Sequence, residues 1–248
     1  MRENGTDIRV GTCGFAEAQA QTFRDLDILE VQRTFYQPPQ IATARRWRER
    51  AGPGFTFTVK AWQLLTHYPG SPTYRRLSQP LGERQRAEAG GLRWNPTTRM
   101  AWDRTLQIAA ALEAEAILLQ TPASFRPTAA NLDSLRNFMH KADRGGRILV
   151  LEPRGEGWTD LLMGDLARET GLVHGVDPFL RAPATGGYRY FRLHGRPAYA
   201  YHYRYTGEDL EALARWVAGQ EPVRVLFNDD AMAEDARRFR ARMHAAVR

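Results

Sequence analysis

Seven short apolar runs in this chain each end in one polar or charged residue. Strand side chains alternate between the two faces of a sheet, so each run has an inward and an outward face. In FTFTVK, for example, Lys60 shares a face with Thr56 and Thr58. A closed parallel α/β barrel carries its functional residues at the carboxyl ends of its strands. The run-ending residues expected at that position are Glu30, Lys60, Gln120, Glu152, Asp177, His194 and Asn228.

Strand and helix signals alternate along the chain, which favours a parallel sheet built from βα units. We expect strands over 8–12, 28–32, 55–61, 116–120, 147–152, 172–177, 188–194 and 222–227. We expect helices over 41–51, 99–114, 128–143, 158–170, 207–218 and 230–247. These elements predict one TIM-type (β/α)8-like barrel domain over residues 1–248.

Two segments interrupt this alternation. The stretch 62–98 is rich in proline and glycine, and it predicts an irregular excursion after the third strand. The segment 178–187 is also rich in proline and glycine and is too short for a full helix, so the helix after the sixth strand should be short or missing.

The composition indicates in which cellular compartment the protein is expected and what kind of partner it can bind. The single cysteine, Cys13, excludes an internal disulfide and favours a reducing cytoplasm. No apolar run is long enough to span a bilayer, and none follows the charges of MRENGTDIRVG, so we expect a soluble protein with no secretory signal. The net charge of +7 is compatible with a nucleic-acid partner. All but two of the 35 basic residues are arginine, which the base composition of a genome would also explain.

Eight segments of this chain share a pattern with a known family. They are VGTCGF (10–15), LEVQRTFY (29–36), FTFTVKAWQLLTH (55–67), LLQTPASF (118–125), LVLEPRGEGW (149–158), YFRLHGR (190–196), YRYTGEDL (203–210) and VLFND (225–229). Taken in order, they resemble the YecE-like family, which is also called domain of unknown function 72. The resemblance implies a TIM-type barrel and brings no established activity with it.

The chain departs from this family pattern at two strand ends. The family tends to have serine and tryptophan where this chain has Cys13 and Phe15, and Asn-Ser where it has Gln32 and Arg33. These differences affect the substrate contacts that the first and second strands are expected to make.

The polar strand ends allow two arrangements. Carboxylates and an imidazole suit a divalent metal ion, and the candidate ligands are Glu30, Glu152, Asp177 and His194. No HxH or HExxH spacing supports them. The alternative is a buried network without metal, in which nearby cations neutralise the carboxylates. Those cations would be Lys60, Arg154 and Arg192.

Three residues have further interpretations. Lys60 is a partner for a strand-end carboxylate, an anion binder or a Schiff-base nucleophile. His194 lies between Arg192 and Arg196, which favour a neutral imidazole that serves as a base or a metal ligand. His67 is a second candidate acid or base, and ordinary loop capping is its alternative.

Tyrosines and arginines are mixed in the segment that contains the seventh strand and the loop after it. Aromatic rings among arginines suit stacking on bases or sugars together with phosphate contacts, and packing around a strand extension is the alternative. The tyrosines are Tyr188, Tyr190, Tyr199, Tyr201, Tyr203 and Tyr205, and the arginines are Arg189, Arg192, Arg196 and Arg204.

We therefore expect an enzyme that acts on a phosphate-bearing small molecule or nucleic acid, by acid–base or metal-assisted hydrolysis. The predicted catalytic residues are Glu30, Lys60, Glu152, Asp177 and His194. The predicted substrate-binding residues are His67, Gln120, Arg154, Arg192, Arg196, Tyr203 and Asn228. The rival functions are a sugar-phosphate isomerase or lyase, and a nucleic-acid-binding module without catalysis that uses 62–104 and the tyrosine stretch.

Overall fold

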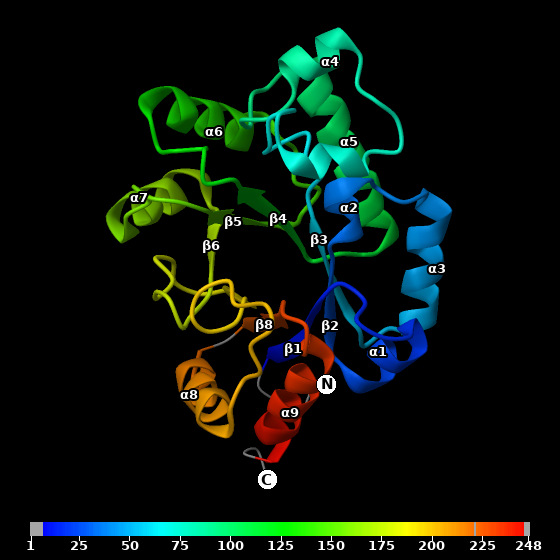
Figure 1. Ribbon diagram of the computed structural model, residues 1–248, viewed down its shortest axis with the longest axis vertical. Helices are drawn as coiled ribbons and strands as arrows, with labels where there is room; N and C mark the ends of the chain where they lie inside the picture. The colour runs from blue at the N-terminus through cyan, green and yellow to red at the C-terminus, as the bar shows by residue number, and fades with distance from the viewer. Residues whose placement is uncertain (1–6, 221, 246–248) are drawn as a thin grey trace. The chain divides into compact units, whose positions relative to one another are not determined.

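The parallel sheet forms in the computed structural model, which describes residues 7–220 and 222–245 (Figure 1). The hydrogen-bonded strand order follows the chain from β1 to β8, and the sheet closes into a barrel. The strands are β1 (Ile8–Cys13), β2 (Ile28–Val31), β3 (Thr56–Lys60), β4 (Ala116–Thr121), β5 (Ile148–Pro153), β6 (Val173–Val176), β7 (Arg189–Leu193) and β8 (Val223–Phe227). This confirms the predicted fold class.

The chain forms two compact units, and each is described by itself. The first comprises 1–30, 50–56 and 174–248, and the second comprises 31–49 and 57–173. The first unit contains α1 (Gln19–Asp25), α8 (Gly207–Val217) and α9 (Met232–Ala245). Figure 1 shows α9 beside β1 and β8, with α8 next to α9. The predicted helix 230–247 thus becomes 232–245, and its last two positions lie outside the described residues, as do positions 1–6.

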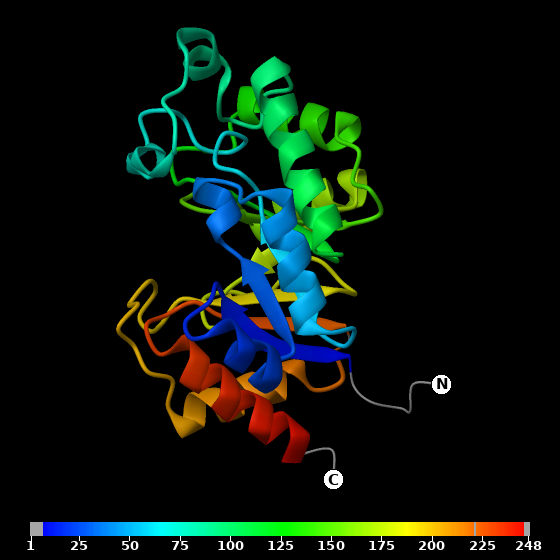
Figure 2. The same ribbon diagram turned by 90° about the vertical axis from the view of Figure 1, so that its right-hand side faces the viewer.

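The second unit carries most of β3, all of β4 and β5, and the remaining helices. They are α2 (Arg33–Tyr36), most of α3 (Ile41–Ala51), α4 (Glu83–Glu88), α5 (Pro96–Ala111), α6 (Ala129–Lys141) and α7 (Asp160–Thr170). Helix α4 packs on α5, and α6 packs on α7. Helices α3 and α5 run side by side (Figure 2), and Arg104 Nη2 donates to the Pro39 carbonyl at 2.6 Å.

Helix α5 begins three residues before the predicted start. Asn95 caps it, because Asn95 Oδ1 accepts from Thr98 N at 3.0 Å while Thr98 Oγ1 accepts from Asn95 N at 3.1 Å. Pro96 follows as the first helical residue, where its missing N–H costs nothing. The proline is therefore a helix start and not part of an irregular loop.

The excursion 62–98 is more ordered than the prediction of an irregular segment. It contains a 3₁₀ helix, η1 (Pro72–Arg76), as well as α4. Ser71 caps η1, and Gln85 Oε1 accepts from Gly82 N at 3.1 Å at the start of α4. The expected gap after β6 is confirmed, since no helix forms over 178–187 in the described chain. No helix in the described ranges is both long enough and apolar enough to cross a membrane.

Candidate active site at the end of strand β7

The strand registers place the predicted residues of the first unit on one face of the sheet. Partners in a parallel ladder point to the same side. Cys13 is paired with Glu30, while Arg192 is paired with Leu226 two residues before Asn228. His194 lies two residues after Arg192, so the two side chains point to the same face of the sheet. Glu30, Arg192, His194 and Asn228 are therefore expected on the same side of their strands.

Glu30 and Arg192 form a fully buried ion pair. Arg192 Nη2 donates to Glu30 Oε1 and Arg192 Nε donates to Glu30 Oε2, both at 2.9 Å. The Tyr190 hydroxyl donates to the same Oε2 at 2.9 Å. Both side chains have at most 1% exposure, so the charges compensate each other in place of water. Arg192, predicted as a substrate contact, is engaged with Glu30.

The same arginine orients His194. Arg192 Nη1 lies 3.3 Å from His194 Nε2. Since a guanidinium only donates, Nε2 must be the acceptor, and the neutral imidazole carries its proton on Nδ1. On the other side, Asp177 Oδ2 accepts from the His194 backbone N–H at 3.0 Å and lies 3.8 Å from Nδ1. His194 is only 1% exposed, with Arg192 beside its Nε2 and Asp177 near its Nδ1.

A loop rich in tyrosine, residues 195–206, lies against His194; we call it the tyrosine loop. Rings of Tyr199 and Tyr201 have centroids 5.6 Å and 6.4 Å from the imidazole, yet they are 45% and 44% exposed. The loop is fastened at its start, where Gly195 N donates to the Tyr205 hydroxyl at 2.9 Å. Exposed rings beside a buried histidine give the loop a surface on which a flat ligand can stack.

The cations of the tyrosine loop each have an acidic partner. Arg196 pairs with Asp209 and lies over the Phe179 ring at 4.7 Å. Arg204 pairs with Glu234 on α9. In addition, His202 Nδ1 lies 2.5 Å from Asp230 Oδ2. The hydroxyl of Tyr203, a predicted substrate-binding residue, donates to Asp209 Oδ2 at 2.6 Å, and this hydrogen bond raises the pKa of Tyr203. The charges of Arg196 and Arg204 are therefore compensated within the first unit.

Asp229 is a further candidate, which the strand-end pattern does not select because that pattern ends at Asn228. It lies directly after Asn228 and is 95% buried. Its Oδ1 accepts from Ala231 N at 2.8 Å, while Oδ2 has no hydrogen-bond partner among the described residues. Burial raises the pKa of Asp229 to about 7, which is suited to acid–base chemistry.

The contacts of the first unit leave little room for the predicted metal centre. Both oxygens of Glu30 are taken by Arg192 and Tyr190. Asp177 Oδ1 accepts from Phe179 N at 3.0 Å, and its Oδ2 accepts from His194 N. Over the described ranges, no group of three or more His, Cys, Asp and Glu side chains has an arrangement that could hold a metal ion. These residues fit a hydrogen-bonded network better than a metal site.

The second unit carries the remaining predicted residues. Gln120 and Glu152 are register partners, and Lys60 is paired with Leu118, two residues before Gln120. The side chains of Lys60, Gln120 and Glu152 therefore point to the same face of the sheet. Glu152 forms an ion pair of 2.6 Å with Arg154. Lys60 Nζ lies 4.1 Å above the Phe35 ring, which is a cation–π contact.

His67 also contacts the Phe35 ring. Its ring centroid lies 4.9 Å from that of Phe35, and its Nδ1 lies 2.8 Å from Thr66 Oγ1. Burial, aided by the charge of Lys60, lowers the pKa of His67 to about 4. His67 is therefore neutral at pH 7.

This pKa predicts a dependence of stability on pH. Between pH 6.5 and 4 the unfolded chain binds a proton at His67 that the folded chain does not, so stability falls as the pH falls through this window. We expect wild type to lose about 2 kcal/mol more of its unfolding free energy than His67→Gln between pH 7 and 5. Urea unfolding of both proteins at each pH measures this difference. Equal losses would contradict the burial of a neutral His67.

Comparison with known proteins identifies the family. The family model described as "Protein of unknown function DUF72" matches residues 16–248. The chain belongs to this family. It is the family that the sequence motifs resemble, so the expected resemblance is confirmed. No curated protein matches the chain.

Solved structures show the same fold. A DUF72 family protein from Enterococcus faecalis is 18% identical with a TM-score of 0.74, and the match covers 97% of this chain and 95% of that one. A xylose isomerase domain containing protein from Salmonella typhimurium is 13% identical with a TM-score of 0.61, covering 100% and 99%. Endonuclease IV from Thermus thermophilus is 14% identical with a TM-score of 0.55, covering 96% and 99%.

The four departures from the family pattern lie at or just after the ends of β1 and β2. Cys13 is buried as the last residue of β1, and the Phe15 ring packs edge-on against Phe23 with a centroid distance of 5.7 Å. Gln32 precedes α2, and Arg33 is its first residue. In this member of the DUF72 family, Phe15 thus contributes to an aromatic cluster.

Proposed function

We propose that this DUF72 member is an enzyme that acts on a phosphate-bearing substrate with a sugar or nucleoside ring. The chemistry is acid–base catalysis at the carboxyl end of β7, with hydrolysis as the leading reaction. One observation carries the proposal: His194 Nε2 lies 3.3 Å from the guanidinium of Arg192, and the ring lies beside the exposed rings of Tyr199 and Tyr201.

The geometry suits His194 to proton transfer. Its Nε2 accepts a hydrogen bond of 3.3 Å from Arg192, which is long enough for a substrate hydroxyl or water to compete with it. A proton taken up at Nε2 would create an imidazolium whose Nδ1–H faces the Asp177 carboxylate 3.8 Å away. Such an orienting carboxylate stabilises the charged form of a catalytic histidine. Asp229 is a second candidate for a proton donor.

The tyrosine loop supports a ring-containing substrate. Its cations are paired within the first unit, so stacking on Tyr199 and Tyr201 is the interaction that the loop offers most directly. The phosphate is assigned to Arg196, whose side chain is 47% exposed despite its pair with Asp209. Two of the structures with the same fold support a substrate with a sugar or nucleoside ring. One is named a xylose isomerase domain containing protein, and another is an endonuclease.

A sugar-phosphate isomerase is the second candidate, and the similarity to the xylose isomerase domain containing protein favours it. The two reactions use the same histidine but give different products. Hydrolysis releases a cleaved ester, whereas isomerisation conserves the mass of the substrate. The assay must therefore follow both phosphate or strand release and interconversion of sugars.

The test is a turnover screen with single- and double-stranded oligonucleotides and with sugar phosphates. We expect turnover of one class, and we expect Tyr199→Ala and Tyr201→Ala each to raise KM about tenfold, the effect of one stacking contact. Tyr68→Ala, which removes a tyrosine that is 39% exposed in the second unit, is the matched control and should leave KM unchanged. Oligonucleotide binding that weakens steeply with salt, without turnover of either class, would instead establish the non-catalytic module.

A further inference from the structure

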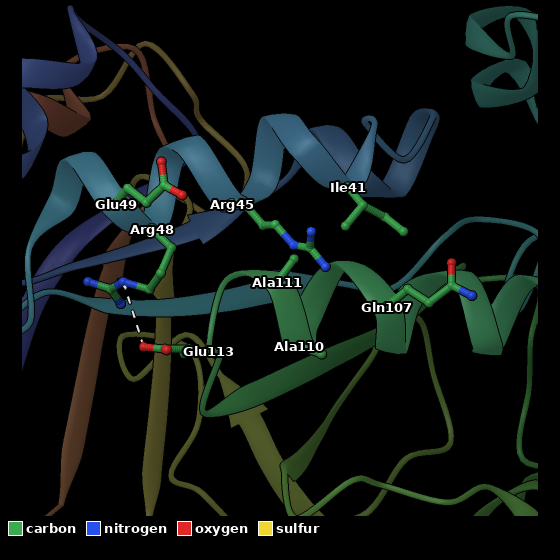
Figure 3. A pocket seen from close by; sticks show the side chains of 8 residues that line it. All are labelled: Ile41, Arg45, Arg48, Glu49, Gln107, Ala110, Ala111 and Glu113. Carbon is green, nitrogen blue, oxygen red and sulfur yellow. Dashed lines mark ion pairs between the residues drawn. The ribbon is translucent and has the colours of Figure 1, made fainter.

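A groove lies between α3 and α5 in the second unit, and the proposed enzymatic function makes no use of it. It encloses about 540 Å³, a volume within the range of small-molecule sites. Figure 3 shows Arg45 and Arg48 extending from α3 toward α5. Its lining consists of Ile41, Arg45, Arg48, Glu49, Gln107, Ala110, Ala111 and Glu113.

Small side chains on α5 account for the space. Ala110 and Ala111 face the groove where two adjacent helices would otherwise interdigitate larger residues. Together with Ile41 on α3 they supply the apolar part of the lining, which we call the apolar floor. A ligand with an apolar body can cover this floor and exclude water from it.

The two arginines differ in what they already contact. Arg48 lies 4.9 Å over the Phe57 ring, and its Nε is 3.9 Å from Glu113 Oε2, the pair marked in Figure 3. Burial lowers the pKa of Arg48. Arg45 is three residues earlier on the same helix face, and it has no ion-pair partner in the part of the chain that the structure describes. Arg45 is thus the cation that the groove offers to a ligand.

Gln107 on α5 adds a polar group to the lining on the Ile41 side of the groove (Figure 3). Gln107 Oε1 accepts from Arg104 Nη1 at 3.3 Å, so its amide nitrogen is the donor that remains for a ligand. Glu49 also lines the groove, but Figure 3 shows its carboxylate pointing away from α5. The lining therefore provides donors at Arg45 together with the apolar floor of Ile41, Ala110 and Ala111.

We propose that this groove binds a small organic anion with an apolar body. The acidic group, a phosphate, sulfonate or carboxylate, contacts Arg45, where its hydrogen bonds are charge-assisted. The body lies on Ile41, Ala110 and Ala111. The site shares no residue with the tyrosine loop, so it stands independently of the proposed catalytic function.

The probe is 1-anilinonaphthalene-8-sulfonate, an aromatic anion whose fluorescence rises in apolar surroundings. We expect saturable binding to the full chain and a loss of affinity of about tenfold or more in Arg45→Gln, the effect of one charge-assisted hydrogen bond. Arg46→Gln is the matched control. Arg46 is the exposed neighbour on α3, donates to Thr43 at 3.0 Å and does not line the groove, so its loss should change affinity less than twofold or so.

Two further measurements distinguish binding at this site from nonspecific binding. Ala110→Leu fills the exposed floor position, and it should abolish binding without unfolding the helix. The uncharged N-phenyl-1-naphthylamine should bind about tenfold more weakly than the sulfonate. Equal losses in Arg45→Gln and Arg46→Gln would show a diffuse basic surface on α3. That result would overturn the proposal. So would unchanged binding in Ala110→Leu, equal affinity for the uncharged probe, or a lack of binding by wild type.

Discussion

Replacing Arg192 by methionine should lower the free energy of unfolding by about 3–5 kcal/mol. The substitution keeps an unbranched side chain but leaves the Glu30 carboxylate buried without the guanidinium that now donates to both of its oxygens. Folded proteins are typically stable by only about 5–15 kcal/mol, so this loss is a large share of the total. Equilibrium urea unfolding measures it.

Two companion variants separate this pair from ordinary ion pairs. Arg204→Met removes a cation from an exposed pair, in which the side chains of Arg204 and Glu234 are 59% and 52% exposed, and it should cost less than about 1 kcal/mol. Adding Glu30→Leu to Arg192→Met removes both buried charges and should recover at least half of the loss. If Arg192→Met cost no more than Arg204→Met, the buried pair would not be a structural element of the first unit.

Substituting alanine for Gly195 should disrupt the tyrosine loop. Gly195 has φ of +85°, and a Cβ there would lie 2.0 Å from the Ala200 carbonyl oxygen. Backbone strain and the clash each cost about 1–3 kcal/mol, so we expect a total of about 2–6 kcal/mol. Because Tyr199 and Tyr201 belong to the displaced loop, turnover should fall together with stability.

Gly207→Ala is the matched control for this substitution. It lies in the same unit at the start of α8, has no atom within 4 Å of an added Cβ, and is not among the glycines with positive φ. Its unfolding free energy should stay within about 0.5 kcal/mol of wild type. A Gly195→Ala protein with wild-type stability and turnover would show that the loop does not need this conformation.

Some of the fold could be predicted because the chain marks its elements clearly. Helix α3 lies where it was expected, closed by the Gly-Pro-Gly that follows it, and each of the eight strands lies within two residues of its expected range. Helices α1, α2 and α4 have only four to seven residues, too few to show a helical period. Pro96 was misread as part of an irregular loop, because its role depends on the Asn95 cap.

The candidate site was predictable in its position and less so in its pairings. Parity selected Glu30 and His194, but the choice of partners depends on residues that are distant in sequence, since Arg192 and Glu30 are 162 positions apart. The tertiary fold decides that Arg192 binds Glu30. Asp229 was missed because the burial that raises its pKa depends on the tertiary fold and cannot be read from the sequence.

The most direct test of the catalytic role of His194 is the turnover of His194→Gln on the substrate class that the screen identifies. Glutamine can still hydrogen-bond but cannot carry the proton, so we expect kcat to fall about 10²–10⁴-fold. His202→Gln changes an exposed histidine of the same tyrosine loop, and it should keep wild-type kcat. A kcat of His194→Gln equal to that of His202→Gln would contradict the assignment of the active site to the end of β7.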